Sequence, residues 1–233
     1  MANVPMVLVR EMADGFTPTS ADINRGLDEY DRCRYLKLRS SLLRNRLIYG
    51  RMLLRTSLSR MTGGAIAPEQ WRFTRTSLGK PELASAGIPF NFSFSLSYSG
   101  PVIAVAISND GSIGVDIELL ADRELPDISV ALTNEEQSFL ADLPQEKKYP
   151  ALIKIWTLKE SIAKLTGQGF VLDFSSFTLL PTTPPSLCSS SVSQLCSEKI
   201  CLDSRDVSVG RHRCILSLAM HQGKNQQTSE KEK

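Results

Sequence analysis

The chain has 233 residues, of which 42% are hydrophobic and 22% are charged, an ordinary balance for a folded globular protein. Its net charge of +2 is too small to indicate nucleic-acid binding by itself, although arginines and lysines are concentrated between Arg32 and Arg60. No apolar run is long enough to span a membrane, and Arg10, Glu11 and Asp14 argue against a secretory signal. Five cysteines without CxxC spacing or a zinc template fit reduced thiols in a cytoplasmic protein.

The first part of the chain is predicted to hold two strands around two helices. Alternating side chains indicate a strand over residues 4–12, and Ser20-Ala21-Asp22 can cap a helix over 22–38. The helix predicted over 39–60 has a wide apolar side and arginines on the rest, which we interpret mostly as a solvated face. A strand over 69–78 follows.

Serines alternate along the next predicted strand, Phe90–Tyr98, which continues through a turn into a second strand, Val102–Ser108. The serines on one face are Ser93, Ser95, Ser97 and Ser99. They could donate hydroxyls to a phosphate, but serines in a strand more often face solvent.

Two carboxylates lie on one side of the strand predicted over Gly111–Leu120, because side chains alternate along a strand. Asp116 and Glu118 are about 7 Å apart at Cα by strand geometry, so they repel unless a cation lies between them. Hard oxygen ligands on a rigid strand suit Mg²⁺. An acidic strand end that faces water is the alternative interpretation.

A capped helix over 134–142 and a longer one over 148–166 are predicted next, the second ending at Gly167. On the longer helix Glu160 and Lys164 are i,i+4 neighbours at the edge of the apolar stripe. Lys159 falls inside that stripe, so it needs a buried carboxylate or phosphate as its partner unless it snorkels to the surface. Taken alone, this pattern also fits an amphipathic core helix.

The remainder of the chain changes character after a strand predicted over Phe174–Leu180. Residues 181–197 are rich in Pro, Ser, Thr and Cys and read as a loop. Strands over 199–203 and 213–220 are expected to close the fold, and residues 222–233 form a polar tail that we expect to be disordered.

One combination of segments is specific. Gly114-Val115-Asp116-Ile117-Glu118, followed after about forty residues by Trp156-Thr157-Leu158-Lys159-Glu160-Ser161-Ile162-Ala163-Lys164, resembles the 4′-phosphopantetheinyl transferase family in its larger, Sfp-type branch. The resemblance extends over roughly residues 30–180. It implies an α+β fold of two pseudo-twofold-related halves with the active site between them. The halves are then residues 1–110 and 111–221, in a monomer.

The resemblance also implies an activity. It is the transfer of 4′-phosphopantetheine from coenzyme A to a serine of an acyl or peptidyl carrier protein. Mg²⁺ would be held by Asp116, Glu118 and Glu160, with Lys164 reaching a phosphate and Glu160 taking the serine proton. The anion that Lys159 requires would be a metal-bound carboxylate or the phosphate itself.

Coenzyme A contacts are implied where the chain matches other family segments. Arg46 begins a stretch similar to the family's Arg-x-x-x-Gly-x-x-Leu-x-Arg, and Lys80-Pro81 matches a turn beside the bound nucleotide. Ser97 and Tyr98 align with the end of Phe-Asn-x-Ser-His-Ser, so Tyr98 stands where the family has histidine. A phenol can donate one hydrogen bond but carries no positive charge, so nucleotide affinity is expected to be weaker or to depend more on Arg46 and Lys80.

The implied partner is a small acidic helical carrier protein, docking on the segment Gly167–Ser190. Phe170, Val171 and Leu172 could form an apolar contact ridge there, or they could belong to the core. Three rival functions stay open: a nucleic-acid-binding protein using the basic helix, an impaired family member that binds without efficient transfer, and a different Mg²⁺-dependent phosphate enzyme.

Overall fold

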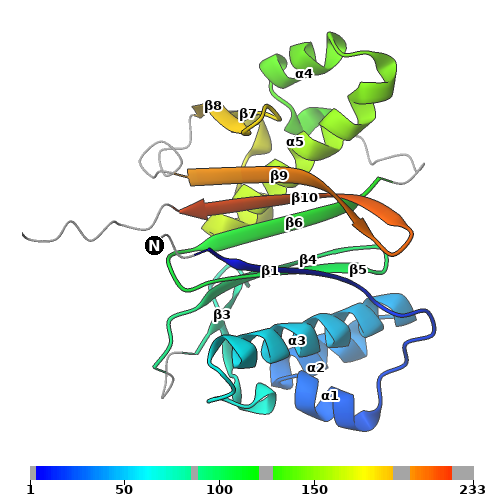
Figure 1. Cartoon of the computed structure of the whole chain (residues 1–233), viewed down its shortest axis with the longest axis vertical. Helices are drawn as coiled ribbons and strands as arrows, with labels where there is room; N and C mark the ends of the chain where they lie inside the picture. The colour runs from blue at the N-terminus through cyan, green and yellow to red at the C-terminus, as the bar shows by residue number, and fades with distance from the viewer. Residues whose placement is uncertain (1–3, 85–88, 121–127, 191–199, 222–233) are drawn as a thin grey trace, which may run out of the picture.

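The structure is a computed structural model that describes residues 4–84, 89–120, 128–190 and 200–221, so the predicted tail lies outside the described residues. Two three-stranded antiparallel sheets form its centre (Figure 1). The first sheet has the order β1-β5-β4, from β1 (Met6–Glu11), β4 (Ser93–Ser99) and β5 (Val102–Ser108). The second has the order β6-β10-β9, from β6 (Ile113–Leu119), β9 (Ile200–Val209) and β10 (His212–His221).

The two halves repeat one topology. In each, the first strand pairs antiparallel with the last, and the last pairs with the strand before it. Each half also has a long helix after its first strand: α3 (Ser41–Met61) in the first half and α5 (Gln145–Thr166) in the second. The α+β class is therefore confirmed. The change of sheet falls between Ser108 and Ile113, close to residue 110.

The strand β5 shows how the layers pack. Ile103, Val105 and Ile107 contact Leu54 and Leu58 of α3 on one face. The alternate residues on its other face pack against β6 and β10 of the second sheet; they are Val102, Ala104 and Ala106. Both faces are fully buried, which explains why this strand is apolar throughout. In Figure 1 the first-half helices lie on one outer side of the paired sheets and α5 on the other.

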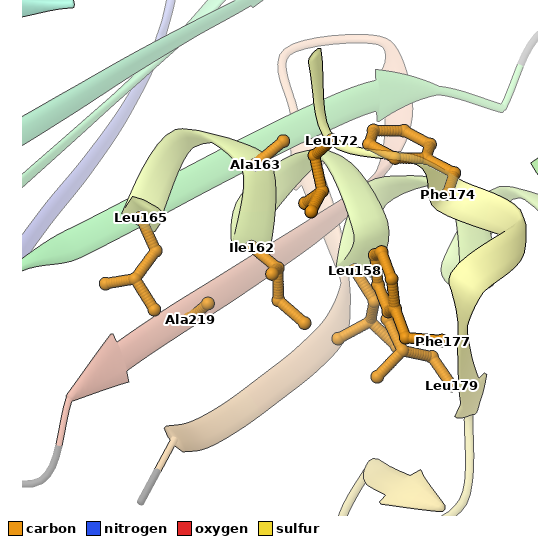
Figure 2. Close-up of a cluster of buried hydrophobic side chains, with 9 residues drawn as sticks. All are labelled: Leu158, Ile162, Ala163, Leu165, Leu172, Phe174, Phe177, Leu179 and Ala219. Carbon is orange, nitrogen blue, oxygen red and sulfur yellow. The ribbon is translucent and has the colours of Figure 1, made fainter. Parts of the chain in front are cut away.

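A second core lies where α5 meets the second sheet and the segment Leu172–Leu179 (Figure 2). Leu158, Ile162 and Leu165 of α5 pack there against Ala219 of β10 and against Phe177, the first residue of β7 (Phe177–Leu180). The helix α4 (Asn134–Ala141) closes the same end of the molecule. The predicted capping box is confirmed, because Thr133 and Glu136 cap each other's backbone at its start.

The helix α5 approaches β6 most closely at Gly114. A Cβ on this glycine would lie 1.9 Å from the carbonyl oxygen of Ser161, so only glycine lets the helix backbone come this near. Gly167 ends the helix in the left-handed conformation, with φ of 74°, as the sequence predicts. The close crossing brings Glu160 and Lys164 beside the carboxylates of β6.

The structure differs from the sequence prediction in five segments. One is β9, which extends to Val209 where the predicted strand ended at residue 203. The single helix predicted over 22–38 is two helices, α1 (Ser20–Gly26) and α2 (Glu29–Lys37), because Asp28 caps a new helix by accepting from the backbone of Asp31. In place of the strand over 69–78 there is a 3-10 turn, Pro68–Gln70, and a short β2 (Phe73–Arg75) paired with β3 (Pro81–Leu83). The predicted strand over 174–180 begins with another 3-10 turn, Phe174–Ser176, and a short β8 (Ser186–Ser190) lies within the predicted loop.

Candidate active site

Asp116 is the most buried carboxylate of the site, with 4% of its surface exposed. Its Oδ1 accepts hydrogen bonds from the Lys164 ammonium and from the Ser97 hydroxyl, both at 2.6 Å. Its Oδ2 is buried and has no hydrogen-bond partner among the described residues. A buried carboxylate oxygen without a donor is costly, so this atom is the natural place for a cation.

Glu160 lies beside this pair on α5. The pKa of its carboxyl is raised to about 7, chiefly by burial and next by the nearby charge of Asp116, against the opposing effect of Lys164. Glu118 also contributes to the increase in pKa. Asp116 and Glu118 therefore interact electrostatically with Glu160. Near neutral pH, Glu160 can accept or release a proton.

These groups line a cavity of about 470 Å³ between the two halves. Asp116, Glu118 and Glu160 come from the second half, as do Lys164 and Trp156. The first half contributes three groups of residues. They are the cations Arg34 and Arg46, the β4 residues Leu96, Ser97 and Tyr98, and the leucines Leu38, Leu43 and Leu47. The cavity thus holds an acidic cluster faced by cations.

A second cavity of about 600 Å³ adjoins the first, and its described lining contains cations but no carboxylate. The cations are Arg34, Arg51, Arg75, Lys80 and Lys164. Arg34, Leu96, Tyr98 and Lys164 line both cavities, so they mark the junction. An extended anion could therefore place one end near the carboxylates and the other among the cations.

Lys80 and Pro81 line this second cavity. The Lys80 ammonium donates to the carbonyl of Leu165 at 2.9 Å, in the last turn of α5, where a helix favours a cation. Burial lowers the pKa of Lys80. This contact joins the β2–β3 turn of the first half to α5 of the second.

Tyr98 lies between α3 and the two cavities. Its ring packs on Gly50 so closely that a Cβ there would be 2.4 Å from the phenol oxygen. The guanidinium of Arg46 is stacked over the ring, 5.6 Å from its centroid. Burial raises the pKa of Tyr98, so the phenol remains protonated and keeps its single donor.

Lys159 has the buried carboxylate partner that its place in the apolar stripe requires, but the expectation that this anion is a metal-bound carboxylate or a substrate phosphate was wrong. The structure places its ammonium away from both cavities, fully buried, 2.9 Å from Oε1 of Glu136 on α4. It also donates to the carbonyls of Phe174 and Phe177. The required anion is thus a structural carboxylate from another helix. Sequence reasoning assigned Glu136 only to a capping box and missed this second role.

The arginines of α3 are less solvated than predicted. Arg51 forms a bidentate pair with Asp31, with 2.6 Å from its Nε to Oδ2, and Asp31 also accepts from Arg75 at 3.0 Å. Arg55 is buried and donates to the backbone carbonyls of Gly26, Pro68 and Trp71. These two arginines hold the first half together and are not available as a nucleic-acid surface.

Sequence reasoning did not single out two residues of the candidate site. Arg34 lies at the junction of the cavities, yet in the sequence it is one cation within a basic run, and no local signal distinguishes it. Ser99 donates to Oε2 of Glu118 at 2.6 Å. The serine face of β4 was expected to meet solvent or phosphate, but Ser95, Ser97 and Ser99 are each less than 7% exposed.

The predicted carrier-docking segment divides into core and surface. Leu172 is buried in the α5 core, whereas Val171 is 73% exposed and lines the second cavity. The side chain of Phe170 lies outside the described part of the structure. Of the described side chains in the predicted ridge, Val171 is therefore exposed and Leu172 is not.

The donor chemistry of Asp116, Glu118 and Glu160 fits a hard divalent cation. Within the described ranges, however, no three His, Cys, Asp or Glu side chains are arranged as a metal site. No described helix is long and apolar enough to cross a membrane.

Neighbouring cavities with acidic and cationic parts suit a phosphorylated ligand, and comparisons with known proteins show which proteins the chain resembles. Residues 112–214 match the model of the 4′-phosphopantetheinyl transferase superfamily. The chain is 32% identical over 149 residues to 4′-phosphopantetheinyl transferase HetI of Nostoc sp. PCC 7120, covering 62% of this chain and 61% of the relative. It is also 32% identical over 133 residues to 4′-phosphopantetheinyl transferase psf-1 of Bacillus pumilus, with 57% and 54% covered.

The chain is therefore similar to members of the 4′-phosphopantetheinyl transferase superfamily, in agreement with the resemblance of its motifs. It spans about 60% of the length of the HetI sequence that it matches and about half of psf-1. Among solved structures, the ACPS–CoA complex of "Chronobacterium ammoniagenes" aligns with a TM-score of 0.34 and 16% identity, covering 48% of this chain and 97% of that one.

Proposed function

We propose that this protein transfers the 4′-phosphopantetheine group of coenzyme A to a serine hydroxyl of an apo carrier protein. The observation that carries the proposal is the pair of joined cavities between the halves. One holds three carboxylates and Lys164, and the other is lined by cations without a described carboxylate. This division matches a substrate whose diphosphate must meet a metal while its nucleotide phosphate meets arginine and lysine.

Asp116, Glu118 and Glu160 would hold Mg²⁺, which neutralises charge on the diphosphate when bound. Lys164 lies within reach of the same region and lines both cavities, so it can stabilise the phosphate that leaves. Arg34, which lies at the junction of the cavities, can do the same.

Glu160 takes the proton of the attacking serine. The serine oxygen forms a bond to the phosphorus that carries the pantetheine arm, and the P–O–P bond to the nucleotide breaks. The nucleotide leaves with the bonding electron pair. A carboxyl group with a pKa of about 7 suits this proton transfer near neutral pH.

The coenzyme A contacts divide between the cavities. Arg46, Ser97 and Tyr98 line the cavity with the carboxylates, and Lys80 and Pro81 line the cationic one. Tyr98 replaces the positive charge of the family histidine with a neutral phenol, although Arg46 is stacked on its ring. We therefore infer that Arg46 supplies the positive charge that the family histidine would otherwise provide. We also infer that the carrier is an acidic protein, whose charge complements the cations beside the cavity.

The test is the intact mass of an apo carrier protein after incubation with the chain, coenzyme A and Mg²⁺. Gain of one phosphopantetheine on the carrier serine is the expected result. Glu160→Gln should keep the fold and lose turnover, whereas Glu146→Gln, an exposed change in the first turn of the same helix, should behave as wild type. Full activity of Glu160→Gln would exclude this residue as the base.

Failure to modify several carrier types, with coenzyme A still bound, would favour an impaired member of the superfamily. The specific observation behind that second candidate is Tyr98, and Tyr98→His would then be expected to restore transfer. Hydrolysis of coenzyme A without a carrier would instead point to a different metal-dependent phosphate enzyme.

A further inference from the structure

The two halves are joined by serine side chains between neighbouring strands. Strands β4 and β6 run side by side with their residue numbers increasing together, so they are parallel, yet they belong to different sheets. Ser93 accepts from the backbone N–H of Ile113 at 3.2 Å, and two further serines repeat the contact. Ser95 accepts from Val115 and Ser99 from Leu119, each at 3.0 Å.

Ser99 uses its hydroxyl twice. A serine hydroxyl has one hydrogen to donate and two lone pairs. The N–H of Leu119 takes a lone pair, and the hydrogen goes to Oε2 of Glu118 at 2.6 Å. With 3% exposure the group cannot exchange these partners for water, so the orientation of its hydrogen is fixed by the backbone of the neighbouring residue.

Asp116 is held in a related way. Ser97 and Lys164 both donate to its Oδ1, which leaves Oδ2 as the buried oxygen without a described partner. In both cases a serine of the first half holds one oxygen of a carboxylate in the second half. Ser95 also accepts a hydrogen bond from β6, but its partner among the described residues is the backbone N–H of Val115 and no carboxylate.

We propose that Ser99 is a positioning residue that orients Glu118 for cation binding, and that Ser97 has the same relation to Asp116. This inference rests on the proposed function, because it takes the cation site as its premise. It goes further because it assigns the orientation of two carboxylates in the second half to serines of the first half. Ligand groups that are held by a second hydrogen bond bind metal more tightly because they need not be ordered on binding.

The experiment titrates the full-length protein with Mn²⁺, which shares the oxygen preference of Mg²⁺, and follows the free ion by electron paramagnetic resonance. Wild type is compared with Ser99→Ala, Ser99→Thr and Ser95→Ala, and thermal unfolding is measured in parallel. Ser95→Ala is a stringent control, because it removes a buried bridging hydroxyl next to Asp116 but no bond to a carboxylate.

Both alanine variants should lower the melting temperature, since each leaves a backbone N–H without its acceptor. Only Ser99→Ala should weaken Mn²⁺ binding, by about tenfold, and Ser99→Thr should recover most of the affinity because it keeps the hydroxyl. In transfer assays the half-saturating Mg²⁺ concentration should rise more than the maximal rate falls.

Equal Mn²⁺ affinity for Ser99→Ala and Ser95→Ala would overturn the proposal and leave Ser99 a structural bridge. If wild type binds no Mn²⁺, the metal site of the proposed function fails, and this inference fails with it; the two failures are thus distinguishable. Where Ser99→Ala does not fold, Ser97→Ala decides the question, with the same tenfold loss expected and wild-type affinity refuting it.

Discussion

The buried pair of Lys159 and Glu136 allows a sharp test of whether a lysine of the motif helix serves the fold or the substrate. Both side chains are fully buried, and Nζ lies 2.9 Å from Oε1. Lys159→Met keeps an unbranched side chain that is one atom shorter and removes the charge. It leaves the Glu136 carboxylate without its cation and the carbonyls of Phe174 and Phe177 without a donor.

Removing one partner of a buried ion pair costs about 3–5 kcal/mol. Glu136 retains two backbone donors, Thr133 at 2.9 Å and Leu179 at 2.8 Å, so we expect a value near the lower end, roughly 3 kcal/mol. For a chain of this size, that corresponds to a fall in melting temperature of about 6–12 °C.

The assay combines urea unfolding with coenzyme A binding measured by calorimetry. Stability should fall as stated, while the dissociation constant for coenzyme A at a temperature where the variant is folded should stay within twofold of wild type. The reasoning is refuted if Lys159→Met is as stable as wild type but binds coenzyme A at least tenfold more weakly, since Lys159 would then contact the substrate.

Three further predictions follow from the site. The raised pKa of Glu160 means that the folded state keeps a proton that the unfolded state has lost, so the stability of the metal-free protein should fall as the pH rises from about 4.5 to about 7. Glu160→Gln should flatten this dependence in unfolding measured with a chelator, and an unchanged pH profile would contradict the raised pKa. Gly114→Ala should abolish folding or lower the melting temperature far more than Gly50→Ala. The first new Cβ meets helix backbone and the second meets the movable ring of Tyr98, so equal circular-dichroism melts would refute that distinction. Tyr98→His should tighten coenzyme A binding at pH 6 relative to pH 8, because only the protonated imidazole adds a positive charge; titration calorimetry at the two pH values checks this, and a pH-independent affinity would refute it.

Sequence periodicity predicted the long elements well, because each has an apolar stripe that local spacing reveals. The helix α3 and the strand β5 agree with prediction for this reason. The prediction was wrong for the short helices, because a capping residue interrupts a stretch whose apolar spacing is continuous. Asp28 begins a second helix inside a stretch that reads as one, and its signal is a single side chain accepting from the backbone.

Only the part of the site that lies on one strand and one helix, β6 and α5, was predictable from the sequence. Asp116, Glu118 and Glu160 line one cavity, as their spacing and the family resemblance indicate, although their role as metal ligands stays a prediction. The partner of Lys159 was not predictable, because Glu136 precedes it by more than twenty residues and its position depends on how α4 packs on α5. Pairings of this kind come from tertiary packing, and the local pattern around each residue is identical with or without them.

The serines of β4 explain why the site requires both halves. In an ordinary sheet, neighbouring parallel strands are linked by backbone hydrogen bonds, and side chains stand clear of the strand plane. Here serine hydroxyls take the place of the backbone acceptors at Ile113, Val115 and Leu119. Because a hydroxyl both accepts and donates, the same link can reach onward to a carboxylate, which a backbone carbonyl cannot do. The link between the halves at Leu119 and the proposed orientation of Glu118 therefore share one atom, the Oγ of Ser99, so a change that separates the strands here should also disorder the acidic cluster.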